Sequence, residues 1–239
     1  MLPGSTFKGL PVNLQAGVKV WNAATSTYTT VESSVQGSNS FYTDGKLLTG
    51  ASGPIRSGLD ISNTGFNLKK FIDPIPGSSN RGQQSDVWWI RYRLAEVHLN
   101  AAEAAFELGN LAEALTNVNK VRDRAGLKTP LATLTLARLQ NERRVELAFE
   151  DHRVWDLTRW RTAHIVWNGS PSNPDANLYA LYPYRVVRPG DARDGKYVYD
   201  KIIAPRFRAP RFFQITNYYN FIAQNVLNAN LLITRQPGQ

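Results

Sequence analysis

The sequence predicts a mainly α protein, with a tetratricopeptide-like helical hairpin and packed helices accompanied by long loops and minor strands. Two amphipathic stripes of helical period lie near the middle of the chain, separated only by a Gly-Asn turn. The flanking segments are rich in Gly, Ser, Thr, Asn and Pro and carry no sustained helical period. We therefore expect a loop-rich segment at 1–82, a helical core at 83–164 and a loop-rich C-terminal segment at 165–239.

The composition sets limits on this prediction. The 239-residue chain is 42% hydrophobic, which suffices for a sizeable core in one large or two small domains. No run approaches about 18 apolar residues, the length of a transmembrane helix. The absence of cysteine excludes disulfides, thiolate catalysis and zinc–thiolate sites. The first residues, MLPGSTFKGLP, lack a charged start followed by an apolar stretch, so we expect no signal peptide in this chain.

The first segment contains two short runs with strand character, GVKVW and TYTTVES, between turn-forming stretches. Aromatic and amide side chains recur in its polar loops and again after residue 165. Flat rings cover the C–H face of a sugar, and amide groups pair with its hydroxyls. The predicted ligand-binding residues are Trp21, Tyr28, Tyr42, Trp167 and Asn168. The alternative is that these rings attach long loops to the helical core.

A helical hairpin is predicted from the spacing of apolar residues in the central segment. The first apolar stripe comprises Ile90, Leu94, Val97, Ala101, Ala105 and Leu108. The polar residues Glu96, Asn100, Glu103 and Glu107 repeat on the opposite side. After Gly109-Asn110 a second stripe comprises Leu111, Ala114, Leu115, Val118, Val121 and Ala125. Two helices joined by so short a turn lie antiparallel, and ELGNLAEALTNVNKV is typical of one tetratricopeptide repeat.

A third helix is expected at Leu134–Phe149, with Leu136, Leu139 and Leu147 on one face and Val145, Ala148 and Phe149 on the other. Such a helix is expected to be buried on both sides. Unpaired buried charges are costly, so the sequence predicts a buried, paired network. Its members are Glu142, Arg143, Arg144 and Glu146.

An enzyme would need catalytic residues, and the candidates are few. Glu142 and Glu146 form a carboxylate pair of the kind that glycosidases use, but side chains at i and i+4 of a buried helix point into packing rather than across a cleft. The sequence holds no HExxH, GxSxG, Walker or GxGxxG motif. We therefore expect no catalytic residues, no metal ligands and no cofactor.

The net charge of +9 favours anionic partners, and Arg185–Arg211 alone carries eight basic residues and three aspartates. No helix-turn-helix, RNA-binding or zinc-finger pattern accompanies this segment. Salt-bridged structure is therefore favoured over nucleic-acid binding, and a steep salt dependence of binding would mark the alternative.

Longer stretches carry a resemblance to a known family. They are SDVWWIRYRLAEVHLNAAEAAFELGN, ALTNVNKVRDRAGL, NERRVELAFEDHRVWDLTRW and NYYNFIAQNVLNANLLITRQPGQ, with PGSTFKG and GFNLKKFID near the start. With these the chain resembles the C-terminal half of the SusD/RagB family of outer-membrane nutrient-binding lipoproteins. The box NERR…EL.FE..R.WDL.RW is the most specific part of that likeness.

The resemblance implies a surface-exposed protein of the cell outer membrane that captures oligosaccharides without catalysis. It further implies delivery to a TonB-dependent SusC-like transporter, and membrane association only through an N-terminal lipid anchor that this chain lacks. It places the box in the structural core, so we expect Trp160 to be buried. Trp167 lies beyond the box, beside Asn168 and a Pro- and Asn-rich loop, and this local chemistry predicts that its ring contacts sugar. Three alternatives stay open: a peptide- or protein-binding family member, a plain repeat scaffold, and a glycan-processing enzyme.

Overall fold

The computed structural model describes residues 6–7, 10–11, 13–35, 37–55, 62–73, 75, 85–207 and 209–239. The chain divides into two compact units, one formed by Met1–Val87 with His164–Gln239 and the other by Trp88–Ala163. Of the described residues, 29% are helical and 17% lie in strands. The expected mainly α architecture is therefore confirmed only in part, because the first unit is built on a β-sheet. Within the described part of the chain, no helix has the length and hydrophobicity of a membrane span.

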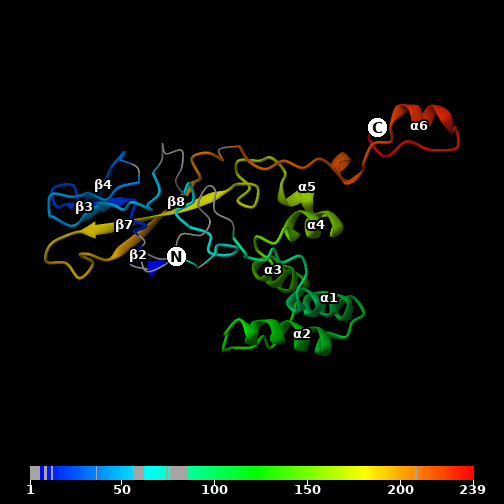
Figure 1. Ribbon diagram of the computed structural model, residues 1–239, viewed down its shortest axis with the longest axis horizontal. Helices are drawn as coiled ribbons and strands as arrows, with labels where there is room; N and C mark the ends of the chain where they lie inside the picture. Colours follow the sequence, from blue (N-terminus) through cyan, green and yellow to red (C-terminus); the bar gives the residue numbers. More distant parts are fainter. Residues whose placement is uncertain are drawn as a thin grey trace. The chain divides into compact units, whose positions relative to one another are not determined.

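The predicted helical hairpin forms from α1 (Leu94–Glu107) and α2 (Leu111–Arg124), which lie side by side in Figure 1. Between them Gly109 has a φ of +76°, a left-handed conformation that glycine adopts without strain. Asn110 caps α2, because its side-chain oxygen accepts a hydrogen bond from the Glu113 N–H at 3.3 Å. The Gly-Asn pair thus ends one helix and begins the next.

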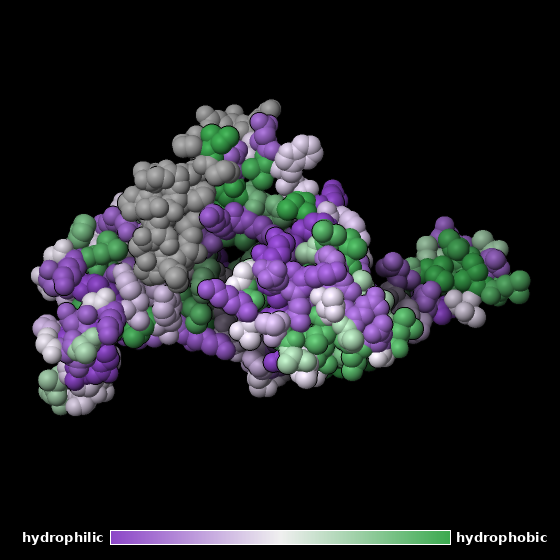
Figure 2. Space-filling view, turned by 90° about the horizontal axis from the view of Figure 1, so that it is seen from below, coloured by the Kyte–Doolittle hydropathy of each residue, from purple (hydrophilic) through white to green (hydrophobic). Residues whose placement is uncertain are grey.

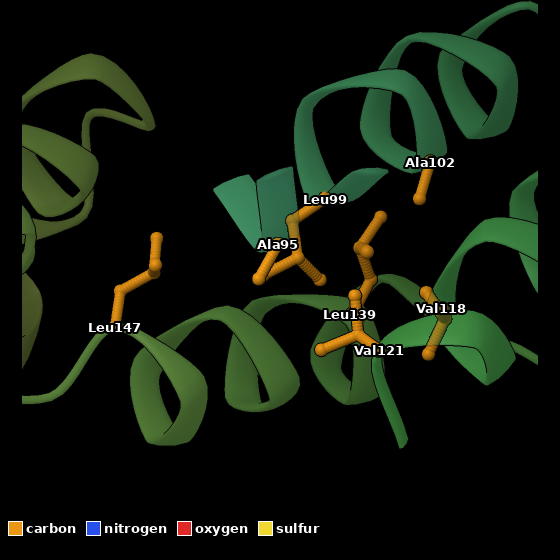
Figure 3. Close-up of a cluster of buried hydrophobic side chains, with 7 residues drawn as sticks. All are labelled: Ala95, Leu99, Ala102, Val118, Val121, Leu139 and Leu147. Carbon is orange, nitrogen blue, oxygen red and sulfur yellow. The ribbon is translucent and has the colours of Figure 1, made fainter. Parts of the chain in front are cut away.

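The core of this unit is a cluster of buried apolar side chains, most of which point toward one another between α1, α2 and α3, while Leu147 at the end of α3 lies to one side (Figure 3). Its members are Ala95, Leu99, Ala102, Val118, Val121, Leu139 and Leu147. The buried face of α1 differs from the predicted stripe, since Leu94 and Leu108 are 68% and 86% exposed. The stripe through Ala95, Leu99 and Ala102 is buried instead, and its small alanines permit a close approach of the neighbouring helices.

Three more helices follow: α3 (Leu136–Glu146), α4 (His152–Arg159) and the short α5 (Ala163–Val166). Within the described chain α3 is buried on one side rather than on the two predicted, because Val145 and Phe149 are 64% and 66% exposed. Phe149 and Asp151 have φ values of +66° and +63° in the turn before α4. Residues other than glycine seldom adopt this conformation. The periodicity of the sequence identifies a second apolar face on α3, but it does not show whether another element packs against that face.

Arg143 is the centre of a buried polar network in the helical unit. Its Nε donates to both carboxylate oxygens of Asp156, at 2.7 and 2.8 Å, and one terminal nitrogen donates to Asn100 at 2.5 Å. Both members of this ion pair are buried. Arg144, predicted for the same network, is exposed on the solvent side of α3, and that prediction was wrong.

The two glutamates of α3 are held by separate arginines. Glu142 accepts a hydrogen bond from Arg122 at 2.9 Å, and Glu146 accepts from Arg93 at 2.5 Å. A second arginine, Arg124, reaches the same Glu146 oxygen at 2.7 Å. Each carboxylate therefore joins α3 to a neighbouring element. The sequence predicted that both glutamates are paired, but it did not identify these arginines.

The acidic side of α1 faces α4. The Glu103 carboxylate accepts two hydrogen bonds from Arg159, at 2.5 and 2.7 Å, and one from the Trp160 indole N–H at 2.7 Å. Burial alone raises the pKa of Glu103, but the hydrogen bonds from Arg159 and Trp160 outweigh it and hold the pKa below its ordinary value. Trp160 is half-buried as part of this contact, rather than a core residue as predicted.

We expect Glu103 to make the helical unit sensitive to acid. A carboxyl group whose pKa is lowered by folding stabilises the protein above its unfolded pKa, here 4.5, and this contribution is lost as the pH falls through the folded pKa. Melting followed by circular dichroism should show a falling Tm below about pH 4.5, and Glu103→Gln should flatten part of that fall. Identical pH profiles for the two proteins would contradict this role.

The other unit is built on a four-stranded sheet in the order β4-β3-β7-β8. Its strands are β3 (Gly17–Asn22), β4 (Thr27–Glu32), β7 (Tyr179–Val187) and β8 (Tyr197–Ile203). β3 and β4 are the two strands expected from GVKVW and TYTTVES, and they pair as an antiparallel hairpin. β3 pairs with β7 in parallel, and β8 continues the sheet antiparallel to β7, as Figure 1 shows.

The strand β7 was predicted as a loop, and that prediction was wrong. Its side chains Tyr182 and Tyr184 are fully buried and pack with Ala16, Ala180 and Ala204. A strand covered on both faces shows no alternation of polar and apolar residues, and its internal proline, Pro183, argued against a strand. Gly17 on β3 leaves room for the Tyr184 ring. A Cβ atom on residue 17 would lie 3.2 Å from a carbon of that ring and 2.3 Å from the Val31 carbonyl oxygen.

Four short strands complete the described sheets: β1 (Thr6–Phe7) with β2 (Leu10–Pro11), and β5 (Ser40–Phe41) with β6 (Leu47–Thr49). The chain ends with a 3₁₀ turn, η1 (Ile215–Tyr218), and α6 (Gln224–Ala229). Figure 2 shows hydrophobic side chains gathered over α6 and the residues after it, where Leu231 and Leu232 are each 92% exposed.

Candidate functional site

Two predicted site residues meet at the tip of the β3–β4 hairpin. Trp21 and Tyr28 are opposite each other in the strand register, and their rings make an edge contact with centroids 5.0 Å apart. The turn between them is fixed locally. The Asn22 side chain accepts a hydrogen bond from the Ala24 N–H at 3.0 Å, and the backbone of Ser26 adopts the left-handed conformation. We call Trp21 and Tyr28 the aromatic pair.

A positive charge covers one side of the aromatic pair. The parallel register that joins Val20 to Val187 carries Arg188 to the level of Trp21, and its guanidinium lies 4.0 Å from the centroid of the indole ring. Cations within about 6 Å of an aromatic ring are attracted by its electron-rich face. This stacking orients the Trp21 ring at the sheet surface.

A cavity of about 290 Å³ opens beside Tyr28 on the same face of the sheet. We call it the sheet cavity, and its lining residues are Lys19, Tyr28, Val186, Arg193, Val198 and Asp200. The Lys19 ammonium donates to Asp200 at 2.6 Å and lies 5.0 Å from the centroid of the Tyr184 ring. The Lys19–Asp200 pair therefore joins β3 and β8, the two strands that flank β7.

The two arginines near the cavity share one carboxylate. Asp191 contacts Arg188 at 3.1 Å and Arg193 at 3.0 Å. The hydrogen bonds from the Arg193 side chain and backbone lower the pKa of Asp191 to about 2, so this carboxylate is ionised at all ordinary pH values. The turn that joins β7 to β8 thus presents more positive than negative charge beside Tyr28.

The Tyr28 hydroxyl is buried and has no hydrogen-bond partner among the described residues. A buried polar group left unsatisfied costs about 1–3 kcal/mol. Buried side-chain polar atoms with no partner are uncommon, and a bound ligand, ion or ordered water is one explanation for such an atom. The hydroxyl is therefore the strongest local sign that the sheet cavity accepts a polar group.

The remaining predicted residues lie elsewhere in this unit. Tyr42 follows β5 and is half-buried; its N–H donates to the Lys46 carbonyl at 2.9 Å, and its carbonyl accepts from the Gly45 N–H. It does not line the sheet cavity. Its observed role is to close the turn between β5 and β6.

Trp167 and Asn168 lie in the loop after α5. The Trp167 carbonyl accepts a hydrogen bond from the Phe213 N–H at 2.7 Å, and the Arg211 guanidinium lies 5.4 Å from the centroid of the indole ring. Asn168 is exposed, and its side-chain oxygen accepts from the Ser170 N–H and from Asn173. The ring is half-buried, so part of it stays accessible on the surface.

The chain matches the model of the SusD family over residues 6–238. The chain belongs to the SusD family. Sequence relatives are the SusD-like protein P2 of Formosa agariphila, 35% identical over 125 residues, and the SusD-like protein P25 of the same organism, 42% identical over 83 residues. These alignments cover 47% and 30% of this chain, and 25% and 15% of the two relatives.

A solved structure of a SusD-like protein from Bacteroides fragilis shares the fold, with a TM-score of 0.55 and 24% sequence identity. The match covers 85% of this chain and 37% of that protein. The chain thus spans about a quarter of its first curated relative and little more than a third of this structure. The resemblance found in the sequence is confirmed at the level of family and fold.

In this SusD family member the charged box forms helix-to-helix ion pairs. Glu142 and Glu146 bind different arginines, and both lie outside the sheet unit that holds the aromatic pair. Among the described residues no group of three or more His, Cys, Asp or Glu side chains is arranged to hold a metal ion. The box therefore contributes packing and ion pairs to the helical unit.

Sequence reasoning missed the residues that surround the aromatic pair. Lys19 lies on β3 and Asp200 on β8, while Arg188 and Arg193 lie in the turn between β7 and β8. The pairing of β3 with β7 joins positions far apart in the chain. The only available signal was the excess of basic residues in Arg185–Arg211, which was interpreted as salt-bridged structure. The structure shows salt bridges and a possible ligand contact in the same segment. Arg188 and Arg193 are both paired with Asp191, and Arg193 also lines the cavity.

Proposed function

We propose that this chain binds oligosaccharide through the aromatic pair and the sheet cavity, as part of a non-catalytic nutrient-capture protein. The observation that carries the proposal is a pair of aromatic rings beside a cavity with an unpartnered buried hydroxyl, in a chain of the SusD family. An indole ring covers the apolar face of a sugar, while charged and hydroxyl groups bind its polar edge.

The geometry supports one sugar-sized subsite with a stacking surface next to it. Ligand pockets range from roughly 300 to 1,000 Å³, so a cavity of about 290 Å³ suits one sugar ring rather than a chain of them. Trp21 adjoins Tyr28, which lines the cavity, and a neighbouring sugar residue would lie on the indole. Trp167 with Asn168, and Tyr42, are proposed as further contacts.

Family membership supports the cellular role. We propose that the protein acts at the surface of the outer membrane and passes its ligand to a TonB-dependent SusC-like transporter. The membrane attachment is proposed to come from a lipid anchor outside this sequence. Co-purification with such a transporter from membranes of the native organism tests the partner, and recovery of the transporter alone would contradict it.

A binding screen tests the proposed function against its alternatives. Oligosaccharides and peptides should be titrated by calorimetry, and we expect measurable affinity for an oligosaccharide and none for the peptides. Bound sugar should be recovered unchanged after prolonged incubation, because Glu142 and Glu146 are occupied by arginines. Peptide binding without sugar binding would favour the peptide-binding alternative, and product formation would favour an enzyme.

A further inference from the structure

We propose that the sheet cavity binds a carboxylate or sulfate group, so that the preferred ligand is an acidic oligosaccharide. This inference rests on the proposed function, because it specifies the chemistry of the sugar at the same site. It is carried by the charges that line the cavity, by the free donors of Arg193 and by the buried Tyr28 hydroxyl.

The lining charges favour an anion. Two cations, Lys19 and Arg193, line the cavity together with a single carboxylate, Asp200. That carboxylate is bound by the Lys19 ammonium at 2.6 Å, which offsets its repulsion of an incoming anion. Arg193 is the second cation of the lining, and its carboxylate partner, Asp191, lies outside the lining. Electrostatic attraction of this kind is stronger in a partly enclosed site than in open water.

Arg193 keeps hydrogen-bond donors for a ligand. Its Nε donates to one oxygen of Asp191 at 3.0 Å, and one terminal nitrogen donates to the other at 3.2 Å. A guanidinium has five N–H donors in a fixed plane, so this pair leaves donors on the terminal nitrogens. The Asp191 contact also fixes the orientation of a side chain that is 54% exposed. Such a guanidinium is suited to planar carboxylates and to sulfate.

The Tyr28 hydroxyl supplies a further hydrogen-bond donor for an anionic group in the cavity. It is buried without a partner, and its O–H can donate to an anionic oxygen placed beside Arg193 and Lys19. Hydrogen bonds to an ionised acceptor contribute more than those to a neutral one. The three side chains come from β3, β4 and the turn before β8, so the sheet holds their positions before a ligand arrives.

The test is a set of titrations with matched sugars. An oligogalacturonate and a sulfated carrageenan oligosaccharide should be compared with neutral galactose oligomers of the same length, at low and at high NaCl. We expect at least one acidic sugar to bind more than tenfold more tightly than its neutral counterpart, and NaCl to reduce that difference. Equal affinities for acidic and neutral sugars would overturn the inference while leaving the proposed function intact; no sugar binding at all would overturn both.

Two substitutions locate the preference in the cavity. Arg193→Gln and Tyr28→Phe should each reduce the acidic-to-neutral affinity ratio several-fold. Lys120→Gln, which removes one exposed charge from α2, is the matched control and should leave the ratio unchanged. Tyr28→Phe should not lower the Tm, because the hydroxyl has no partner in the free protein. A preference that persists in both variants, or that Lys120→Gln also abolishes, would overturn the assignment.

Discussion

Arg143→Ala is expected to lower the free energy of unfolding of the helical unit by about 3–5 kcal/mol, the usual cost of removing one partner from a buried ion pair. Arg143 binds both oxygens of Asp156 and also Asn100, and only 3% of Asp156 is exposed. Without the guanidinium, Asp156 would be left with the longer contact to Arg159 at 3.2 Å, and it would stay buried as a poorly compensated charge or take up a proton; both outcomes destabilise the fold. Urea unfolding followed by circular dichroism measures the loss.

The neighbouring Arg144 provides the control for this experiment. It has the same charge and the same helix, but it is exposed. Arg144→Ala should therefore change the free energy of unfolding by no more than about 0.5 kcal/mol. Similar losses for the two variants would show that the buried pair with Asp156 does not stabilise the unit in the way described.

Trp21→Ala is expected to weaken oligosaccharide binding by more than tenfold, which corresponds to about 1.4 kcal/mol or more. The substitution removes the stacking surface, the edge contact with Tyr28 and the ring on which Arg188 rests. Cross-strand aromatic pairs contribute about 0.2–1 kcal/mol, so the hairpin itself should remain folded. Calorimetric titration measures the affinity, and a thermal melt measures the stability.

The control for Trp21 is Trp88, which is 88% exposed and belongs to the other unit. Trp88→Ala should bind sugar like the original protein. If Trp21→Ala retains full affinity, or if its only effect is a lower Tm, the aromatic pair is a hairpin contact and the proposed site is wrong. Trp167→Ala, measured in the same way, decides whether the loop after α5 contributes a further contact.

The helical hairpin and the strands β3 and β4 were predictable because their signals are local. A short Gly-Asn turn between two apolar stripes determines the first, and alternating β-prone residues determine the second. The ion pairs of the charged box were also predicted. Glu142 and Arg143 lie on a helix with a buried apolar face, and a charge buried there without a partner would be costly. Arg144 shows the limit of this prediction. It follows the buried Arg143 by one position, but its side chain is exposed to solvent.

The sheet and the site depended on contacts that the sequence does not reveal. β7 contains a proline and is buried on both faces, which removes the alternation that marks a strand. Its parallel pairing with β3 brings Arg188 to Trp21, and β8 brings Asp200 to Lys19. Sequence reasoning could name Trp21 and Tyr28 as aromatic residues near polar loops. Only the strand register places them together beside a charged cavity.

The most direct test of sugar binding at the aromatic pair is an NMR titration that follows the indole N–H signals of the six tryptophans, assigned by single substitutions. As oligosaccharide is added, the signal of Trp21 should shift in a saturable manner, while those of Trp88, Trp155 and Trp160 in the helical unit should not. Saturable shifts confined to the helical unit, with Trp21 unchanged, would contradict the proposal that the sheet unit carries the binding site.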